Sequence, residues 1–360
     1  MKKIFIDELK SGTTVSDFYA VSTCEKRLTK ANKYFITAKI MDCTGEINAI
    51  AWDNAETLEK VLIPNAIVKI NAIVESYDGN IQLKILDAKE LTSHDKINIA
   101  DFKKASNFNL DDMQKQLFEF INSIENEDLK ALLNYFFENQ EYIEKFKSFP
   151  AAKSMHHAYV GGLIEHTLST ARSADLLCKN YKEVNRDLLI TGVLLHDFAK
   201  IFEFNNDIVV EYSLHGSLVG HIVMGSELVA RATETLPNFP DKLKWQIQHL
   251  LLSHHGEPEF GAAVVPVTLE AILLSTIDRL DAHIFQITNA IKNEQDKSGD
   301  FTQKIYGLER RFLKSNFDEN LINTQENGNI SPEQINQLKE KLSSKNIKAE
   351  DNNTNGDLFK

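Results

Sequence analysis

The sequence predicts a multidomain α+β protein in which a five-stranded β-barrel is followed by an all-α helical bundle. Three observations lead to this prediction. Short segments of alternating apolar and polar residues, separated by turn residues, fill the first ~95 residues. Beyond them, apolar residues recur at helical spacing, as at Met113, Leu117 and Ile121. Nine of the 11 histidines fall between His156 and His255, which concentrates the chemistry-bearing side chains in the helical part.

The composition is that of a globular protein with room for two ordinary domains. The chain has 360 residues, of which 42% are hydrophobic and 26% are charged. No apolar run approaches the ~18 residues of a membrane span, and the N-terminus lacks a signal-like apolar stretch, so we expect a cytoplasmic protein without membrane contact. The net charge of −12 argues against indiscriminate polyanion binding, although it allows a local basic strip. Cys24, Cys43 and Cys178 lack metal-type spacing and are expected to be free.

The N-terminal segment reads as five short strands with one helix. Alternation and turn residues predict the strands at 14–22, 34–42, 46–52, 66–74 and 80–86, and a helix at 54–61. A helix between the third and fourth of five strands is the plan of an OB barrel. We therefore expect residues 1–95 to form an OB-fold, nucleic-acid-binding domain.

Helical periodicity dominates the rest of the chain. We expect a helical linker at 96–150, which Pro150 ends, and a helical domain at 151–317. Polar or glycine-containing breaks interrupt that domain at 205–207, 237–240 and 256–266. The tail at 318–360 is rich in polar residues, and we expect one short helix near Ser331 and partial disorder.

Histidines and aspartates occur at five places in the helical domain, each within or at the end of an apolar helical segment. Any one of them alone is more often a core polar group than a ligand. Together they predict a metal site, because imidazole and carboxylate ligands suit divalent transition metals, and a buried carboxylate is costly unless it is paired or coordinating. The five places are His166, the doublet His196-Asp197, His221, the pair His254-His255, and Asp278.

The doublet must lie at a helix end or bend if both side chains are to bind one metal, because adjacent helical residues diverge by about 100°. It directly follows the apolar run 188–195. Lys200 comes one helical turn later, and either a solvated helix end or a contact to a substrate phosphate fits it. Gly216 and Gly220, which precede His221, would permit close helix packing.

The order of these residues resembles that of the HD-domain phosphohydrolase superfamily. The resemblance implies that His166, His196, Asp197 and Asp278 hold a first metal ion. It implies that His221 and His254 hold a second ion with Asp197 as the bridge, and that His255 is a ligand or supports one. Asp197 and Lys200 are then the expected catalytic residues, and water activated by one or two cations would attack phosphorus.

The predicted barrel carries a candidate handle for single-stranded nucleic acid. Basic residues can contact phosphates and aromatic residues can stack on bases. The expected phosphate contacts are Lys26, Arg27, Lys30 and Lys33, near Lys39, with Glu25 as the acidic residue among them, although a solvated loop would explain this cluster of charges equally well. Tyr34 and Trp52 are the candidate stacking residues, although packing within the barrel would explain each of them equally well.

The two halves together resemble the YhaM-type 3′-5′ exoribonuclease family, most clearly at 155–167 and 253–256. This resemblance implies exonucleolytic hydrolysis of single-stranded RNA to mononucleotides, with single-stranded DNA as a further substrate. It implies Mn²⁺ as the cation, with Fe and Co as alternatives. Two other functions stay open at this point, a phosphohydrolase of a small cyclic or alarmone nucleotide and a non-catalytic nucleic-acid-binding protein. The sequence leaves the oligomeric state open.

Overall fold

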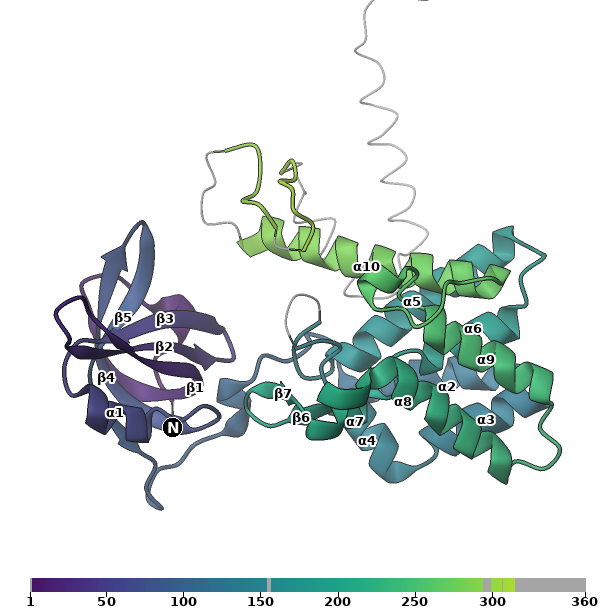
Figure 1. The fold of residues 1–360 in the computed structure, drawn as a ribbon, viewed down its shortest axis with the longest axis horizontal. Coiled ribbons are helices and arrows are strands. Elements are labelled where there is room, and N and C mark those ends of the chain that lie inside the picture. The colour runs from purple at the N-terminus through teal and green to yellow at the C-terminus, as the bar shows by residue number, and fades with distance from the viewer. Residues whose placement is uncertain (1, 154–156, 294–298, 306, 315–360) are drawn as a thin grey trace, which may run out of the picture. The chain divides into compact units, whose positions relative to one another are not determined.

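The structure, a computed structural model, describes residues 2–153, 157–293, 299–305 and 307–314 (Figure 1). The chain divides into two units, Met1–Gln286 and Ile287–Lys360. The polar tail expected at 318–360, with its short helix near Ser331, lies outside the described residues. Within the described residues, every helix is too short or too polar to cross a membrane.

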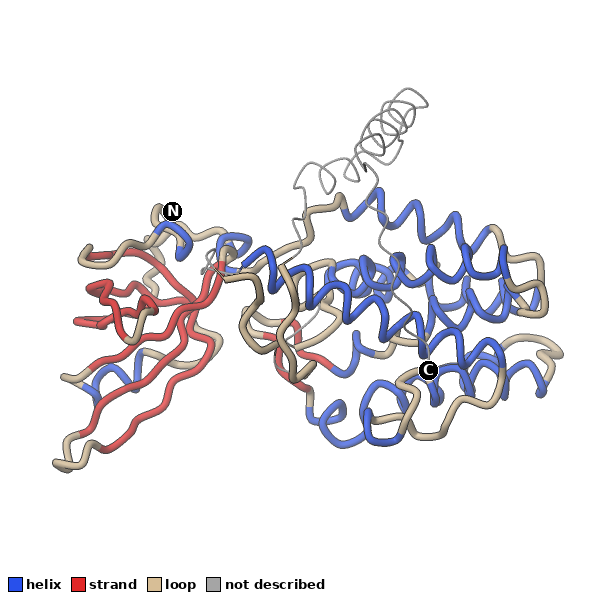
Figure 2. Tube along the Cα trace, turned by 90° about the horizontal axis from the view of Figure 1, so that it is seen from above, coloured by secondary structure: helices blue, strands red, loops and turns tan. Residues whose placement is uncertain are grey.

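The N-terminal strands close into a barrel with the order β1-β2-β3-β5-β4. Helix α1 (Ala55–Val61) lies between β3 and β4, so the predicted OB-type barrel is confirmed. The barrel closes through a parallel pairing of β3 with β5, at Ala49↔Leu83. Figure 2 shows the strands of this barrel in red. The five strands are β1 (Thr14–Leu28), β2 (Tyr34–Asp42), β3 (Gly45–Ala51), β4 (Ile67–Tyr77) and β5 (Asn80–Glu90).

Strand β1 is longer than predicted, because it pairs with two different partners. Its first half pairs with β4, from Thr14↔Ile73 onward, and its second half pairs with β2 as far as Leu28↔Tyr34. The register shifts between Val21 and Thr23, and such an irregularity bends a strand. The residues after this bend are mostly exposed and charged, so apolar alternation could not reveal them.

Nine helices in the described residues follow the barrel's α1 and build one apolar core. Helices α2, α3 and α4, from the segment expected as a linker, contribute to the same core as the later helices. For example, the ring of Phe198 lies 4.8 Å from that of Phe136 and 5.7 Å from that of Phe146. The predicted domain boundaries stay predictions. The helices are α2 (Leu110–Asn122), α3 (Glu127–Phe137), α4 (Gln140–Ser148), α5 (Gly162–Asn180), α6 (Arg186–Leu195), α7 (Lys200–Glu203), α8 (Leu214–Thr235), α9 (Asp241–Ser253) and α10 (Leu269–Asn293).

The prediction of helix between the breaks of the domain at 151–317 is wrong in two places, just beyond the break at 205–207 and near the end of the domain. A hairpin of β6 (Phe204–Asn206) and β7 (Val210–Tyr212) follows α7, because Asn-Asn-Asp turns the chain before a β-branched run. In the second unit, the described residues between 299 and 314 form isolated bridges rather than a helix. Positive φ angles at Gly307 and Glu309 explain this break.

Candidate active site

Two histidines of the site lie directly after the ends of apolar helices. His196 follows α6 and His254 follows α9, as the position of the doublet predicts. Each ring donates its Nδ1 hydrogen to a carbonyl of the preceding helical turn, His196 to Val193 at 2.7 Å and His254 to Leu251 at 2.7 Å. The last carbonyls of a helix lack partners within the helix, so they are available for these bonds. Both Nε2 atoms are therefore left with a lone pair for another ligand.

One half of the site gathers ligand atoms from α5, the end of α6 and α10. His166 Nε2 lies 3.2 Å from His196 Nε2 and 3.2 Å from Asp278 Oδ1. Asp197 Oδ2 lies 3.3 Å from His196 Nε2. These four residues come from three separate helical segments, and they are the set that the resemblance to HD-domain phosphohydrolases implies for a first metal ion. Two nitrogen and two oxygen ligands suit a divalent transition metal.

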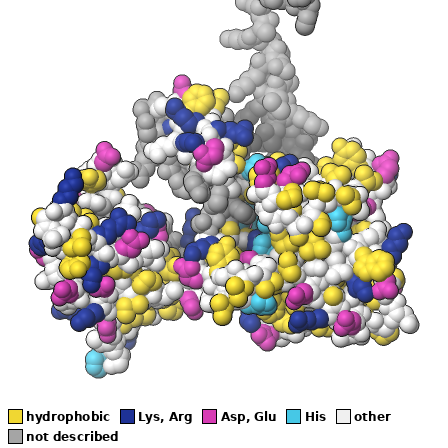
Figure 3. Space-filling model, viewed as in Figure 1, with side chains coloured by type: hydrophobic (Ala, Val, Ile, Leu, Met, Phe, Trp, Pro, Cys, Tyr) yellow, Lys and Arg dark blue, Asp and Glu magenta, His cyan; other side chains and the backbone are white. Residues whose placement is uncertain are grey.

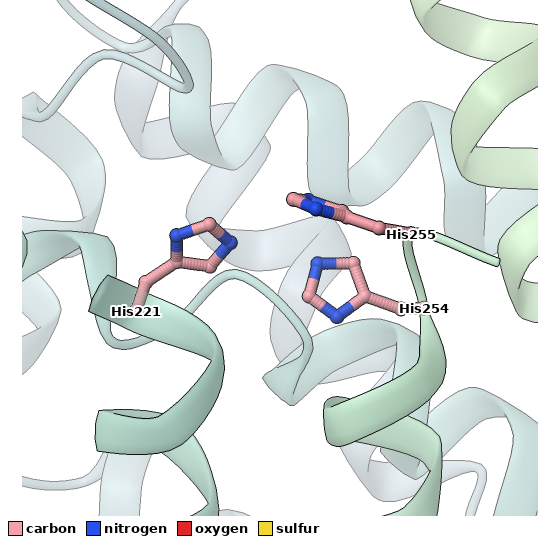
Figure 4. A group of neighbouring side chains, drawn as sticks. All are labelled: His221, His254 and His255. Atoms are coloured by element: carbon pink, nitrogen blue, oxygen red, sulfur yellow. The ribbon is translucent and has the colours of Figure 1, made fainter. Parts of the chain in front are cut away.

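The other half lies on the opposite oxygen of the same aspartate. Asp197 Oδ1 is 3.4 Å from His221 Nε2 and 3.7 Å from His254 Nε2. The ring of His255 lies 4.4 Å from that of His254 and 5.4 Å from that of His221. Figure 4 shows these three imidazoles facing a shared space, His221 from α8 and the other two from the end of α9. Their ligand atoms lie within 4.8 Å of one another, so one ion can contact all three.

Three atoms in this half are buried and have no hydrogen-bond partner among the described residues. They are Asp197 Oδ1, His221 Nε2 and His254 Nε2. A buried polar atom without a partner costs about 1–3 kcal/mol, so three that face one another need an explanation. A divalent cation would satisfy all three atoms at once. The donor set therefore fits a bound metal, with Asp197 between the two halves.

Two carboxylates that the sequence did not point to, the buried Glu203 and the half-buried Asp281, orient the ligand histidines. Asp281 Oδ2 accepts from His166 Nδ1 at 2.8 Å, and Glu203 Oε1 accepts from His221 Nδ1 at 2.9 Å. A carboxylate on the far nitrogen fixes the tautomer of a metal-binding histidine and strengthens it as a ligand. The position of Asp281, three residues after Asp278 on α10, is a signal that sequence reasoning could have used.

Glycines before His221 set its position on α8. A Cβ at Gly216 would lie 2.1 Å from the carbonyl oxygen of Glu203, so only glycine permits this close approach. Gly220 has a different role from the packing expected of it. Its φ of 75° and ψ of 153° interrupt the helix, and this kink precedes His221 directly. The backbone N–H of His221 donates to Glu203 Oε1 at 2.9 Å, so one carboxylate holds both the backbone and the ring.

Burial and charge in the pocket favour the cation-binding forms of Asp197 and His254, and the protonated form of His166. Burial would raise the pKa of Asp197, but Lys200 and His196 outweigh it and hold this pKa well below its ordinary value. Burial, with neighbouring His255, holds the pKa of His254 well below its ordinary value, which keeps this ring neutral. Burial opposes protonation of His166, yet hydrogen bonds with Asp278 and Asp281 raise the pKa of His166 to about 10. The carboxylates therefore favour positive charge in the first half.

Lys200 is buried beside the pocket and forms an ion pair with the bridging aspartate. Its Nζ lies 2.7 Å from Asp197 Oδ2. The solvated helix end considered for this residue is therefore wrong, because the first residue of α7 faces inward. A contact to a substrate phosphate stays a prediction. Of the motif at 155–167, Met155 and His156 lie outside the described residues.

The basic cluster on the barrel is more neutralised than the sequence indicated. Lys26 pairs with Glu59, Arg27 with Glu25 at 2.6 Å, Lys33 with Asp53 at 2.8 Å and Lys39 with Glu46 at 2.8 Å. The expectation of Glu25 as the one acidic neighbour is wrong, because strand pairing and α1 bring in acids that are distant in sequence. On the barrel face seen in Figure 3, Lys and Arg lie among Asp and Glu. Lys30 is exposed and has no ion pair among the described residues.

The candidate stacking residues have exposed rings. Tyr34 and Trp52 are 44% and 42% exposed, so neither ring is part of the barrel core. Trp52 stacks on Phe35, with ring centres 5.0 Å apart and an angle of 22° between the planes. Lys26 Nζ lies 5.2 Å from the ring centre of Tyr34. Both rings are therefore partly accessible to solvent, and a base can stack only on an aromatic ring that it can reach.

Glu203 offers a test of the second half of the site. Glu203→Gln keeps the size of the side chain but removes its charge, so it weakens the hold on His221 Nδ1. We expect metal affinity in this half to fall about tenfold to a hundredfold, with the first half retained. Competitive metal titration of the purified protein measures this, with Glu227→Gln, an exposed position on α8, the helix that carries His221, as the control. Equal affinities in both variants would contradict a role for Glu203.

Comparison with known proteins places the chain in a family. The profile of the HD domain matches residues 163–283, and one described as a putative helicase matches residues 103–183. The match to a solved OB-fold domain of replication protein A from Methanococcus maripaludis covers 26% of this chain and 98% of that chain, at 13% identity and a TM-score of 0.21. The assignment of an OB-type barrel rests on the strand order and not on this match. The 3′-5′ exoribonuclease YhaM of Geobacillus sp. (strain WCH70) is 34% identical over 321 residues, which cover 89% of this chain and 97% of that protein. YhaM of Bacillus subtilis (strain 168) is 31% identical over 318 residues, 88% of this chain and 99% of that protein. The chain therefore belongs to the YhaM 3′-5′ exoribonuclease family.

Proposed function

We propose that this protein is a metal-dependent 3′-5′ exoribonuclease that hydrolyses single-stranded RNA to mononucleotides, and single-stranded DNA as a further substrate. The observation that carries the proposal is the convergence of buried, unpaired ligand atoms on Asp197 in a chain of this family. The metal is a divalent cation, and we propose Mn²⁺, with Fe and Co as alternatives that the same nitrogen and oxygen ligands accept.

The proposed ligands divide between two ions. His166, His196 and Asp278 would hold one, His221 and His254 the other, with His255 as a further ligand, and Asp197 would contact both. When bound, such ions activate a water molecule for attack on phosphorus and neutralise charge on the phosphate oxygens.

The chain's own residues supply orientation and charge. Glu203, Asp281 or a helix-end carbonyl holds the far nitrogen of four of the five proposed ligand histidines, so these ligand nitrogens are already oriented before substrate binds. Lys200 is a fixed positive charge next to Asp197, and we propose that it contacts a phosphate oxygen of the substrate. A buried ammonium stabilises the negative charge that develops there more strongly than a solvated one.

The barrel would hold RNA upstream of the cleaved end. We propose that Lys26, Arg27, Lys30 and Lys33 contact phosphates and that Tyr34 and Trp52 stack on bases. Three of these four basic residues form exposed ion pairs, and such pairs contribute little stability, so phosphates can replace the carboxylates at small cost. The exposed rings of Tyr34 and Trp52 offer about 1–3 kcal/mol per stacked base.

Digestion of end-labelled RNA tests the activity. With a 5′ label and Mn²⁺, we expect a ladder that shortens progressively, and with a 3′ label we expect immediate release of a labelled mononucleotide. A 3′-phosphorylated or blocked end serves as the control for the direction. Turnover of small cyclic or alarmone nucleotides without digestion of RNA would refute the proposal in favour of the other enzyme class. Tight RNA binding without any cleavage would refute it in favour of a binding protein.

A further inference from the structure

A cavity of about 360 Å³ in the first unit is lined by four lysines. Its lining includes residues of the barrel and residues of the helical part. The lysines are Lys39, Lys103, Lys104 and Lys153, and the acidic residues of the lining are Glu46 and Glu211. The lining is thus net positive, in a chain whose net charge is −12. Local positive charge in an acidic protein indicates an anionic ligand.

The lysines of this cavity are available for a new anionic partner. Lys103 Nζ donates to the carbonyl oxygen of Asn206 at 2.8 Å and to its side-chain oxygen at 3.1 Å, and has no carboxylate in ion-pair contact among the described residues. A half-buried ammonium with neutral partners is costly, and an incoming anion would offset that cost. Lys39 and Lys153 form exposed ion pairs with Glu46 and Glu211, which water already screens.

Tyr159 connects the wall of the cavity to the metal ligands. Its hydroxyl is hydrogen-bonded to His157 Nδ1 at 2.8 Å, and His157 Nε2 lies 3.3 Å from Asp281 Oδ2. The same carboxylate oxygen holds His166. The cavity wall therefore lies two side chains away from a proposed metal ligand.

Backbone hydrogen bonds fix the chain segment that carries two of these lysines. The N–H of Val160 donates to the carbonyl of Lys104 at 2.9 Å, and that of Ser106 donates to the carbonyl of Val160 at 2.8 Å. The segment that carries Lys103 and Lys104 is thus tied directly to the segment that carries Tyr159. Lys104 Nζ lies 6.0 Å from the ring centre of Tyr159. An ordered lysine wall loses less entropy on binding than lysines on a free loop.

We propose that this lysine-lined cavity binds the phosphodiester backbone of single-stranded RNA upstream of the nucleotide at the metal site. The inference rests on the proposed function, and it adds a second phosphate-binding place to the one proposed on the barrel. It assigns Lys103, Lys104 and Lys153 to the binding of long strands. These lysines add no affinity for a substrate that is too short to reach the cavity.

The test uses the full chain with Lys104→Ala and Lys153→Ala combined, because both side chains are exposed and their loss leaves the core intact. The control combines Lys182→Ala and Lys242→Ala, two exposed lysines of the helical part outside the cavity, so the net charge changes equally. The affinity for a fluorescent 20-nucleotide oligo(A) RNA is measured in EDTA, without cleavage, over a series of salt concentrations. A second measurement compares kcat/KM for this RNA and for a dinucleotide with Mn²⁺ present.

We expect the cavity variant to bind RNA about tenfold more weakly at ~0.1 M salt, and its salt slope to fall by about 1.4 relative to the control. The loss in kcat/KM should be about tenfold larger for the long RNA than for the dinucleotide. Affinity and slope equal to those of the control would overturn the proposal, and so would equal losses on both substrates. Because the binding measurement contains no cleavage step, wild-type protein that binds RNA through these lysines but releases no mononucleotide would refute the proposed exonuclease alone.

Discussion

Replacing Asp197 by asparagine should abolish RNA hydrolysis, with kcat reduced by at least about 10³-fold, or ~4 kcal/mol in the barrier. Both oxygens of this carboxylate face ligand nitrogens, Oδ2 in one half of the site and Oδ1 in the other. An amide offers one neutral oxygen and an NH₂ group that cannot bind a cation. One substitution therefore weakens the binding of both proposed ions. Single-turnover digestion of end-labelled RNA measures the loss of activity.

The same substitution also tests whether the loss is chemical or structural. Asp197→Ala would leave the buried Lys200 ammonium unpaired, and breaking a buried pair in this way costs about 3–5 kcal/mol of stability. Asp197→Asn keeps an oxygen as a partner for Lys200, so most of the stability should remain. Asp241→Asn, at an exposed acidic position in the first turn of α9, is the matched control. Wild-type turnover in a folded Asp197→Asn protein would refute the metal assignment.

Removal of divalent cations should stop catalysis to a similar extent and lower the melting temperature. Three buried ligand atoms lose their only candidate partner, and the anionic Asp197 is left with Lys200 as its principal counter-charge. Ligands that bind the folded state stabilise it in proportion to their affinity, so the apoprotein should melt earlier. Activity is measured after treatment with EDTA and gel filtration, and again after addition of Mn²⁺.

Magnesium alone provides a useful contrast in that experiment. Mg²⁺ prefers oxygen ligands, whereas the second half of the site offers imidazoles and one carboxylate oxygen. We expect Mn²⁺ to restore activity at a lower concentration than Mg²⁺. RNA binding at low salt should survive chelation, because the lysines of the barrel and the cavity need no cation. Full activity after chelation would contradict the proposed chemistry.

Sequence pattern predicted most of the fold, and its failures have physical causes. Alternation located all five barrel strands because each buries one face in the core. It missed the second half of β1, whose exposed residues are held by pairing with β2 rather than by burial. The β6-β7 hairpin was also missed, because strands of three residues carry too little alternation to separate them from a helix break.

The types of the proposed ligands could be predicted from the sequence, but the carboxylates that hydrogen-bond to the ligand histidines could be predicted only in part. His196-Asp197 follows an apolar run, so its place at a helix end could be predicted from the chain itself. Asp281 was within reach of the same reasoning, one turn after Asp278. The role of Glu203 could not be predicted in this way, since it depends on the close approach of two helices at Gly216. The ion pairs of Lys26 and Lys33 also depend on tertiary contacts, because their acidic partners lie 33 and 20 residues away in the chain. The sequence alone therefore did not predict them.

Elemental analysis of the purified protein tests the proposed metal centre most directly. Inductively coupled plasma mass spectrometry on wild-type protein should find about two divalent ions per chain after reconstitution with Mn²⁺. His166→Gln and His221→Gln should each lose about one of them, and Asp197→Asn should lose both. Wild-type protein that is fully active while holding no stoichiometric metal would contradict the metal centre built here around Asp197.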